Sequence, residues 1–155
     1  MVTEPGFDLA AAHEYFSVQC FNQVWALIDK PERTPAEDQE MVELCLASLW
    51  HWSQREDCTP THLSIGYWQA SRVFALLGQA ENAIQYARMC LNVSHESDVL
   101  PFYLGYAYEA MARAASAAKD HEKVAEYLAK ARRVAAAVPD PEERDQLLED
   151  LESIR

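Results

Sequence analysis

Hydrophobic residues along this chain recur every three or four positions, which is the spacing of one face of an α-helix. Val18, Phe21, Trp25 and Ile28 show the pattern in the first such segment. Charged and polar residues fill the positions between, and no segment alternates with the two-residue period of a strand. The pattern therefore predicts an all-α chain of about seven antiparallel helices. We expect them at about residues 9–28, from 35, from 60 to Gly78, at 80–93, 99–118 and 121–138, and from 141.

Several of these helices have clear start and stop signals. Thr34-Pro35-Ala36-Glu37 is a capping box with proline at the first helical position, and Thr59-Pro60 repeats the threonine–proline start. Asp140-Pro141 opens the last helix in the same way. Gly78 is expected to form the left-handed turn between two antiparallel helices.

Two segments follow one helical-hairpin pattern about 41 residues apart, beginning at Tyr67 and Tyr108. Small residues recur where two helices must pack closely. Such a pattern is typical of a tetratricopeptide-type repeat, whose usual period is about 34 residues. The matched positions are Tyr67, Ala70, Ser71, Phe74, Gly78, Ala83, Ala87 and Cys90 in the first segment, and Tyr108, Met111, Ala112, Ala115, Lys119, Val124, Leu128 and Ala131 in the second.

The last helix has a single apolar stripe, made by Leu147, Leu148, Leu151 and Ile154, and is otherwise acidic. One polar face is typical of the helix that closes the end of a solenoid. We therefore expect residues 1–155 to form one domain, a short tetratricopeptide-like right-handed solenoid with a C-terminal capping helix.

Composition narrows the class of partner. The formal net charge of −12 argues against a nucleic-acid partner, because affinity for DNA depends on Lys and Arg that neutralise phosphates. No hydrophobic run is long enough to cross a membrane, and we expect no membrane partner. The four cysteines are widely spaced and the N-terminus does not resemble an export signal. We expect reduced thiols in a cytoplasmic protein.

Sequence motifs for catalysis and for cofactors are sparse. The chain has no Gly-rich phosphate loop, no GxSxG and no HExxH, so we expect no cofactor. Cys58 and His62 are four residues apart, with His51 nearby in sequence, but no second ligand pair follows. Structural zinc normally needs four ligands at recognisable spacings, so we expect no metal site.

The first helix of each tetratricopeptide-type hairpin lines a concave groove. On that geometry, three residues from each of two helices should face the groove: Ile65, Trp68 and Arg72, with Tyr106, Glu109 and Arg113. Tyr67 lies beside them in an aromatic concentration between Trp50 and Phe74. We take these seven residues as the candidate ligand-binding site.

Arg72 and Arg113 occupy equivalent repeat positions and should face the same space. Two guanidinium groups so placed can bind a carboxylate bidentately. Alternatively, Glu109 lies one turn before Arg113 and simply pairs with it. The sequence leaves both interpretations open.

His51, between Trp50 and Trp52, is a second candidate position. A histidine there is more often a hydrogen-bonded structural residue than a catalyst. If it reaches the groove, its near-neutral pKa would suit a proton carrier.

Several runs resemble a family of bacterial tetratricopeptide-like proteins of unassigned function. They include Leu49-Trp50-His51-Trp52 and Trp68-Gln69-Ala70-Ser71-Arg72-Val73, and the resemblance extends over most of residues 15–154. It implies a polar cluster around the groove, formed by Ser48, His51, Trp52, Trp68, Gln69, Arg72, Glu109 and Arg113. Where the family tends to be polar this chain is more apolar, at Leu46, Leu49, Ile65, Tyr67 and Tyr103, which implies a more hydrophobic pocket.

Two classes of function follow. The first is a non-catalytic binding module whose groove holds a peptide, a protein, or a small molecule with an apolar body and an acidic group. The second is a small-molecule pocket, in its most concrete form a cyclase or isomerase acting on an apolar metabolite, with Glu109 or His51 as acid and base. We favour the binding module. A short solenoid also has two ends, which is compatible with a homodimer.

Overall fold

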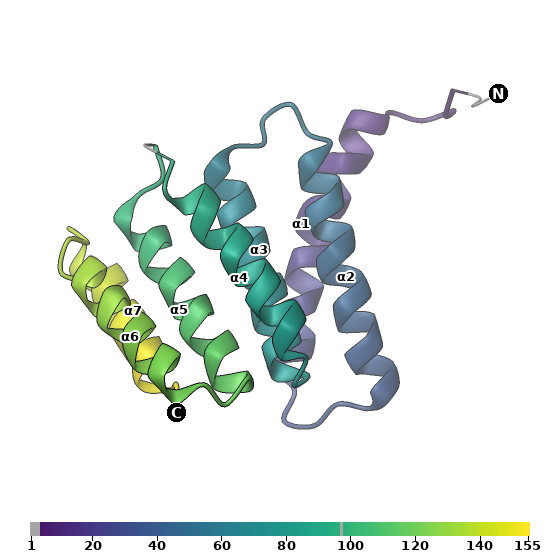
Figure 1. The fold of residues 1–155 in the computed structure, drawn as a ribbon. Helices are drawn as coiled ribbons and strands as arrows, with labels where there is room; N and C mark the ends of the chain where they lie inside the picture. Colours follow the sequence, from purple (N-terminus) through teal and green to yellow (C-terminus); the bar gives the residue numbers. More distant parts are fainter. Residues whose placement is uncertain (1–3, 97) are drawn as a thin grey trace. The chain divides into compact units, whose positions relative to one another are not determined.

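The computed structural model describes residues 4–96 and 98–155, and within them it contains seven helices and no strand (Figure 1). The prediction of an all-α chain is confirmed. The helices are α1 (Leu9–Ile28), α2 (Pro35–Ser53), α3 (Pro60–Leu76), α4 (Ala80–Ser94), α5 (Pro101–Ala117), α6 (His121–Ala135) and α7 (Pro141–Glu152).

Helix starts follow the capping signals closely. The Thr34 hydroxyl accepts from the Glu37 amide, and the Glu37 carboxylate accepts from the Thr34 amide. At α3, His62 takes the place of the glutamate, because its Nδ1 accepts from the Thr59 amide at 3.1 Å. His62 is therefore part of a helix cap.

Several helix boundaries differ from the sequence prediction by one to three residues, and two of them have a clear cause. α5 begins at Pro101 and not at Val99, because Leu100 has the extended backbone of an N-cap and proline suits the first helical position. α6 ends at Ala135 and not at Val138, since the amides of Ala137 and Val138 bond three residues back, in a tightened last turn.

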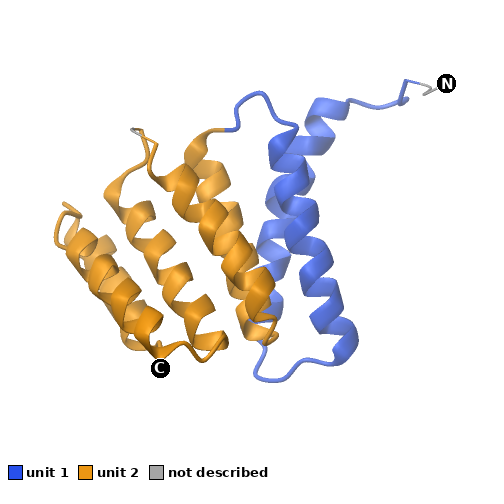
Figure 2. Ribbon diagram, viewed as in Figure 1, with its two compact units in different colours: residues 1–58 blue, residues 59–155 orange. Residues whose placement is uncertain are grey.

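The chain divides into two compact units, residues 1–58 and residues 59–155, which Figure 2 colours blue and orange. The first unit contains α1 packed against α2, and the second contains α3 to α7. Each unit is described by itself below. The single domain expected from the sequence stays a prediction.

Within the second unit, the two helical pairs end their first helices with the same turn. Gly78 has φ 71°, and Lys119, its equivalent, has φ 58°. The amide of Gln79 bonds to the Phe74 carbonyl at 2.9 Å, and the amide of Asp120 bonds to the Ala115 carbonyl at 3.0 Å. These bonds are the signature of a Schellman turn. The correspondence between the two hairpins therefore extends to their backbone.

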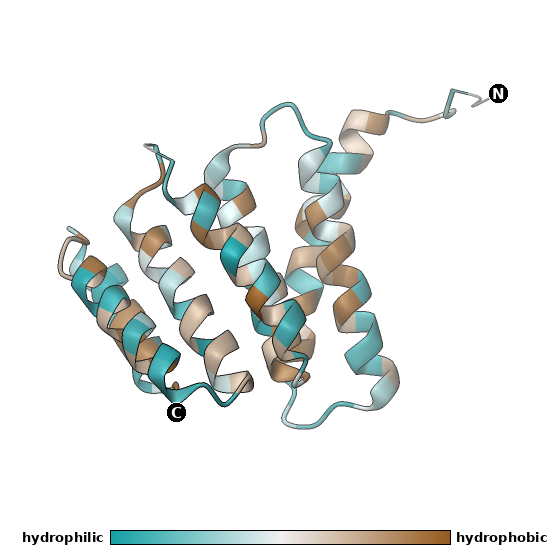
Figure 3. Ribbon diagram, in the orientation of Figure 1, coloured by the Kyte–Doolittle hydropathy of each residue, from teal (hydrophilic) through white to brown (hydrophobic). Residues whose placement is uncertain are grey.

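The helices of the second unit pack mainly through small side chains. α3 packs against α4 and α5, α4 also packs against α5, and α5 packs against α6. α4 and α6 are amphipathic, with hydrophobic and hydrophilic residues alternating along them (Figure 3). Their buried positions include Ala83, Ala87 and Cys90 in α4 and Val124, Ala131 and Ala135 in α6.

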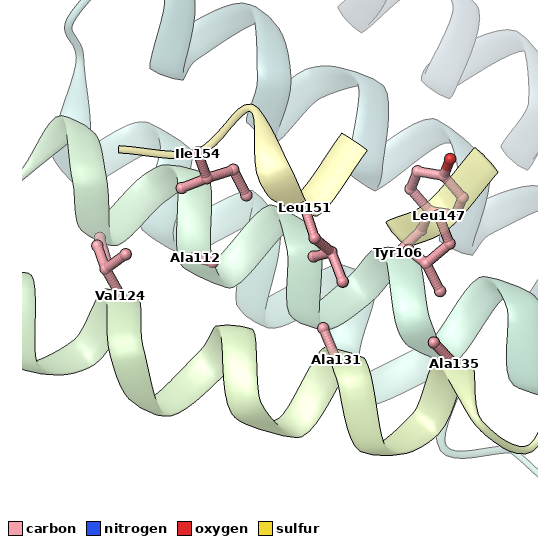
Figure 4. Close-up of a cluster of buried hydrophobic side chains, with 9 residues drawn as sticks. Tyr106, Ala112, Val124, Ala131, Ala135, Leu147, Leu151 and Ile154 are labelled. Carbon is pink, nitrogen blue, oxygen red and sulfur yellow. The ribbon is translucent and has the colours of Figure 1, made fainter. Parts of the chain in front are cut away.

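α7 packs against both α5 and α6. Leu147 and Leu151 are buried with Ile154, and they meet Tyr106 and Ala112 of α5 in one hydrophobic cluster (Figure 4). The apolar stripe predicted for this helix is therefore its packing face. Among the described residues, no helix combines the length and apolar composition needed to cross a bilayer.

Candidate functional site

Equivalent positions of the two hairpins meet directly across α3 and α5. The indole Nε1 of Trp68 donates to Glu109 Oε2 at 2.8 Å, and the two residues are 41 positions apart. Arg72 and Arg113 lie one helical turn further along the same two helices. The prediction that these four residues gather on neighbouring helices agrees with these contacts.

Glu109 is a carboxylate with no solvent exposure, and both of its oxygens have partners. Oε2 accepts from Trp68, and Oε1 accepts from Nε of Arg113 in an i,i+4 ion pair. Nη1 of Arg72 is 3.7 Å from the same Oε1. Burying a charge is costly unless it is paired and hydrogen-bonded, and here it is both. Of the two interpretations left open by the sequence, the pairing of Glu109 with Arg113 is present.

Arg113 also joins α5 to the end of α7. Its Nη2 donates to the Ser153 hydroxyl at 2.8 Å and to the Asp150 carbonyl at 3.2 Å. The carboxylate of Asp150 accepts from the Tyr106 hydroxyl at 2.6 Å. The cluster therefore includes groups from α7 that the sequence analysis did not assign to the site.

The environment of Arg72 works against its positive charge. Burial lowers the pKa of its guanidinium, and repulsion by Arg113 lowers it further, while Glu109 and Asp150 act in the opposite direction. Burial, and then the bond to Asp150, raise the pKa of the Tyr106 hydroxyl well above its usual range. Tyr106 therefore remains a neutral donor at physiological pH.

A pocket of about 200 Å³ opens beside this cluster, between α3, α5 and the end of the chain. Its walls carry positive charge from three arginines (Arg72, Arg113 and Arg155), hydroxyl groups from serines, and several apolar side chains. The lining residues are Arg72, Ala75, Leu76, Arg113, Ser116, Ala117, Ser153, Ile154 and Arg155. The pocket thus combines cationic donors with an apolar wall.

The predicted site residues fall into three groups. Arg72 and Arg113 line the pocket. Glu109 pairs with both arginines outside the pocket lining, and Trp68 donates to Glu109. Tyr106, only 7% exposed, packs its ring edge-on against Trp68 at 5.3 Å. Tyr106 is thus covered rather than open to a groove, because α7 packs over it.

Tyr67 and Ile65 lie away from these contacts. The ring of Tyr67 is 6.4 Å from that of Tyr86 on α4, so it faces the partner helix of its own hairpin. Ile65 is half-buried and does not line the pocket. Sequence reasoning missed the other pocket residues, which are Ala75, Leu76, Ser116, Ala117, Ser153, Ile154 and Arg155. Four of them had a local signal, since they follow Arg72 or Arg113 by three or four positions on the same helix. The three residues after α7 had none.

His51 belongs to the first unit, where it forms a pair with His13. Their Nδ1 atoms are 2.8 Å apart, so one ring donates and the other accepts. The Trp50 and Phe16 rings pack against His51 at 4.9 and 5.4 Å. Burial, and to a smaller extent the neighbouring His13, lower the pKa of His51. The residue is hydrogen-bonded within the α1–α2 pair.

The geometry defines an all-α protein of packed helix pairs with a buried ion-pair cluster beside a small cationic pocket. Comparisons with protein-family models, with curated proteins and with solved structures gave no match. Within residues 4–96 and 98–155, no three His, Cys, Asp or Glu side chains are grouped as metal ligands would be.

Proposed function

We propose that the second unit is a non-catalytic binding module of the tetratricopeptide-like solenoid type, with α7 as its capping helix. Its ligand is a molecule or peptide with an acidic group and an apolar part, held at the pocket beside Arg72 and Arg113. The shared Schellman turns and the direct Trp68–Glu109 bond support a repeat arrangement. The packing of α7 on α5 and α6 supports its role as a cap.

The observation that carries the proposal is the composition of the pocket wall. Two arginines from equivalent positions line it, while the carboxylate they share is buried outside the lining. The surface offered to a ligand therefore consists of cationic and hydroxyl groups next to apolar carbon. Such a surface, on a chain with a net charge of −12, favours an anion with an apolar body.

A binding role also fits the state of Glu109 better than acid–base catalysis does. A general acid or base must reach a substrate proton within hydrogen-bonding distance. Both oxygens of Glu109 instead accept from side chains of the protein, and the residue has no exposed surface.

The test is a titration of the protein with a panel of organic acids and acidic peptides, each paired with its neutral amide, followed by isothermal calorimetry. We expect at least one acid to bind, with its amide at least about tenfold weaker, which corresponds to about 1.4 kcal/mol. Arg72→Gln should remove this preference. Arg88→Gln, a change at an exposed arginine on α4, is the control and should keep it. If no acid binds more tightly than its amide, the proposal is wrong.

A further inference from the structure

We propose that the ligand of the Arg72–Arg113 pocket is a short, branched-chain monocarboxylate, with its carboxylate at the arginines and its alkyl group on Leu76 and Ile154. The inference rests on the proposed function and narrows it to one class of molecule.

The pocket is large enough for a small organic acid. A water molecule occupies about 30 Å³ in the liquid, so a pocket of about 200 Å³ has room for at least about six or seven heavy atoms. A carboxylate uses three of them and leaves room for about four carbons. An acid of about five carbons, such as isovalerate, therefore fits within the pocket.

The charged wall fits a single head group. Arg72 lies on α3 and Arg113 on α5, so their guanidinium groups approach the pocket from two helices. Nε and Nη2 of Arg113 already donate within the protein, which fixes the orientation of its guanidinium plane. Mutual repulsion and burial disfavour the charge on Arg72, and the negative charge of a bound anion would offset both effects. A doubly charged ligand would be repelled more strongly by a chain of net charge −12.

The apolar wall fits a compact alkyl group. Leu76 is 47% exposed although it ends a packed helix, and it lines the pocket together with Ala75, Ala117 and Ile154. Covering this exposed leucine with an alkyl group removes apolar surface from water. A branched chain covers more of it than a linear chain of the same length. Acetate has only a methyl group beside its carboxylate and covers little of this surface, so isovalerate should bind more tightly than acetate.

Binding should also tighten the end of α7. Ser153, Ile154 and Arg155 line the pocket, and Ser153 is already bonded to Arg113. A ligand that contacts α3, α5 and this segment together can bind only when the segment is folded in place, so binding stabilises that position. We therefore expect hydrogen exchange at the amides of residues 151–155 to be slower when isovalerate is bound.

The experiment is a two-dimensional NMR titration of the full chain with isovalerate, isovaleramide, acetate and inorganic phosphate. Isovalerate should bind at least tenfold more tightly than the other three and shift the amides around Arg72, Arg113 and Ser153. Leu76→Ser should weaken isovalerate at least threefold and leave acetate unchanged. If phosphate or acetate binds as tightly as isovalerate, or if the Leu76 variant is unaffected, the inference is overturned.

Two arginine variants test the head group. Arg72→Gln should abolish the isovalerate shifts, and Arg72→Lys, which keeps the charge but loses the planar fork, should weaken binding. Arg88→Gln is the matched control, and circular dichroism checks that each variant is folded. If these variants bind isovalerate like the parent protein, the inference is overturned.

The two proposals fail in different ways. If a larger acid or an acidic peptide binds in an Arg72-dependent manner while isovalerate does not, the inference is wrong and the binding module stands. If no acid binds better than its amide, both are wrong.

Discussion

Glu109 organises the residues around it because a buried carboxylate must be matched by donors. Trp68 from α3 and Arg113 from its own helix supply them, and Arg113 in turn reaches Asp150 and Ser153 at the end of α7. Breaking a buried ion pair by replacing its charged partner, here Arg113, typically costs about 3–5 kcal/mol. One residue thus links three helices, and its position sets the orientation of Arg113 at the pocket.

His51 should make the free energy of unfolding depend on pH. Because burial and His13 lower its pKa in the folded chain, the unfolded chain binds the proton more readily, with a pKa of about 6.5. The free energy of unfolding should therefore be highest above about pH 6.5 and decrease as the pH falls through that value. Urea unfolding between about pH 5 and pH 8 measures the slope, and His51→Gln should flatten it.

The control for that prediction is His121→Gln, because His121 is exposed at the start of α6. Its pH slope should match that of the parent protein. Equal slopes in the His51 variant and the parent would show that the lowered pKa does not contribute to stability.

At the residue scale, sequence reasoning identified the cluster but not its full membership. Trp68, Arg72, Glu109 and Arg113 were found because a repeat places equivalent positions on neighbouring helices. Ser153 and Arg155 were missed because they follow a helix outside the repeat, and nothing local in the sequence indicates where its end packs. Tyr106 was assigned to an open groove for the same reason, since α7 covers it.

At the scale of elements, helix starts were predictable because capping is a local interaction. Thr34 and Thr59 cap the helices they precede. The turn at Gly78 could be read from glycine alone. Lys119 adopts the same left-handed backbone without being glycine, and only its equivalence to Gly78 in the repeat indicates it. Contacts between distant helices were less predictable, since an apolar stripe does not specify its partner.

Gly105 tests the packing of α5 against α7. A Cβ at this position would clash with Cδ2 of Leu147, whose side chain is fully buried. Gly→Ala inside a helix normally stabilises by about 0.5–1 kcal/mol, whereas forced overpacking costs about 1–3 kcal/mol. We therefore expect Gly105→Ala to destabilise the protein by about 1 kcal/mol in urea unfolding, because the clash outweighs the helix propensity.

A double-mutant cycle provides the control for Gly105. On a Leu147→Ala background the added methyl group has room, and the same Gly105→Ala change should then stabilise the protein. If Gly105→Ala already stabilises the parent protein, α7 does not pack on α5 in the way that the clash with Leu147 requires.

At the scale of the whole molecule, the pocket and its supporting residues all lie within residues 59–155. The hydrophobic cluster around Leu147 and Leu151 lies there too, and so does every partner described above for Glu109. Helix periodicity predicted the seven helices found in residues 4–96 and 98–155. It did not predict the division at residue 58, because the same periodicity runs through both units.

A fragment of residues 59–155 should therefore fold by itself and retain the pocket. Five packed helices enclose its core, and the Trp68–Glu109–Arg113 cluster with its bonds to α7 is complete within it. We expect the fragment to unfold cooperatively in urea and to bind acids with an affinity within about threefold of the full chain, a difference of about 0.7 kcal/mol. The matched control is residues 59–140, which lacks α7 and with it the Asp150 and Ser153 partners of Arg113. That shorter fragment should lose binding together with much of its stability, since Tyr106 and Arg113 become uncovered. A 59–155 fragment that is helical but does not unfold cooperatively would show that its core depends on the rest of the chain.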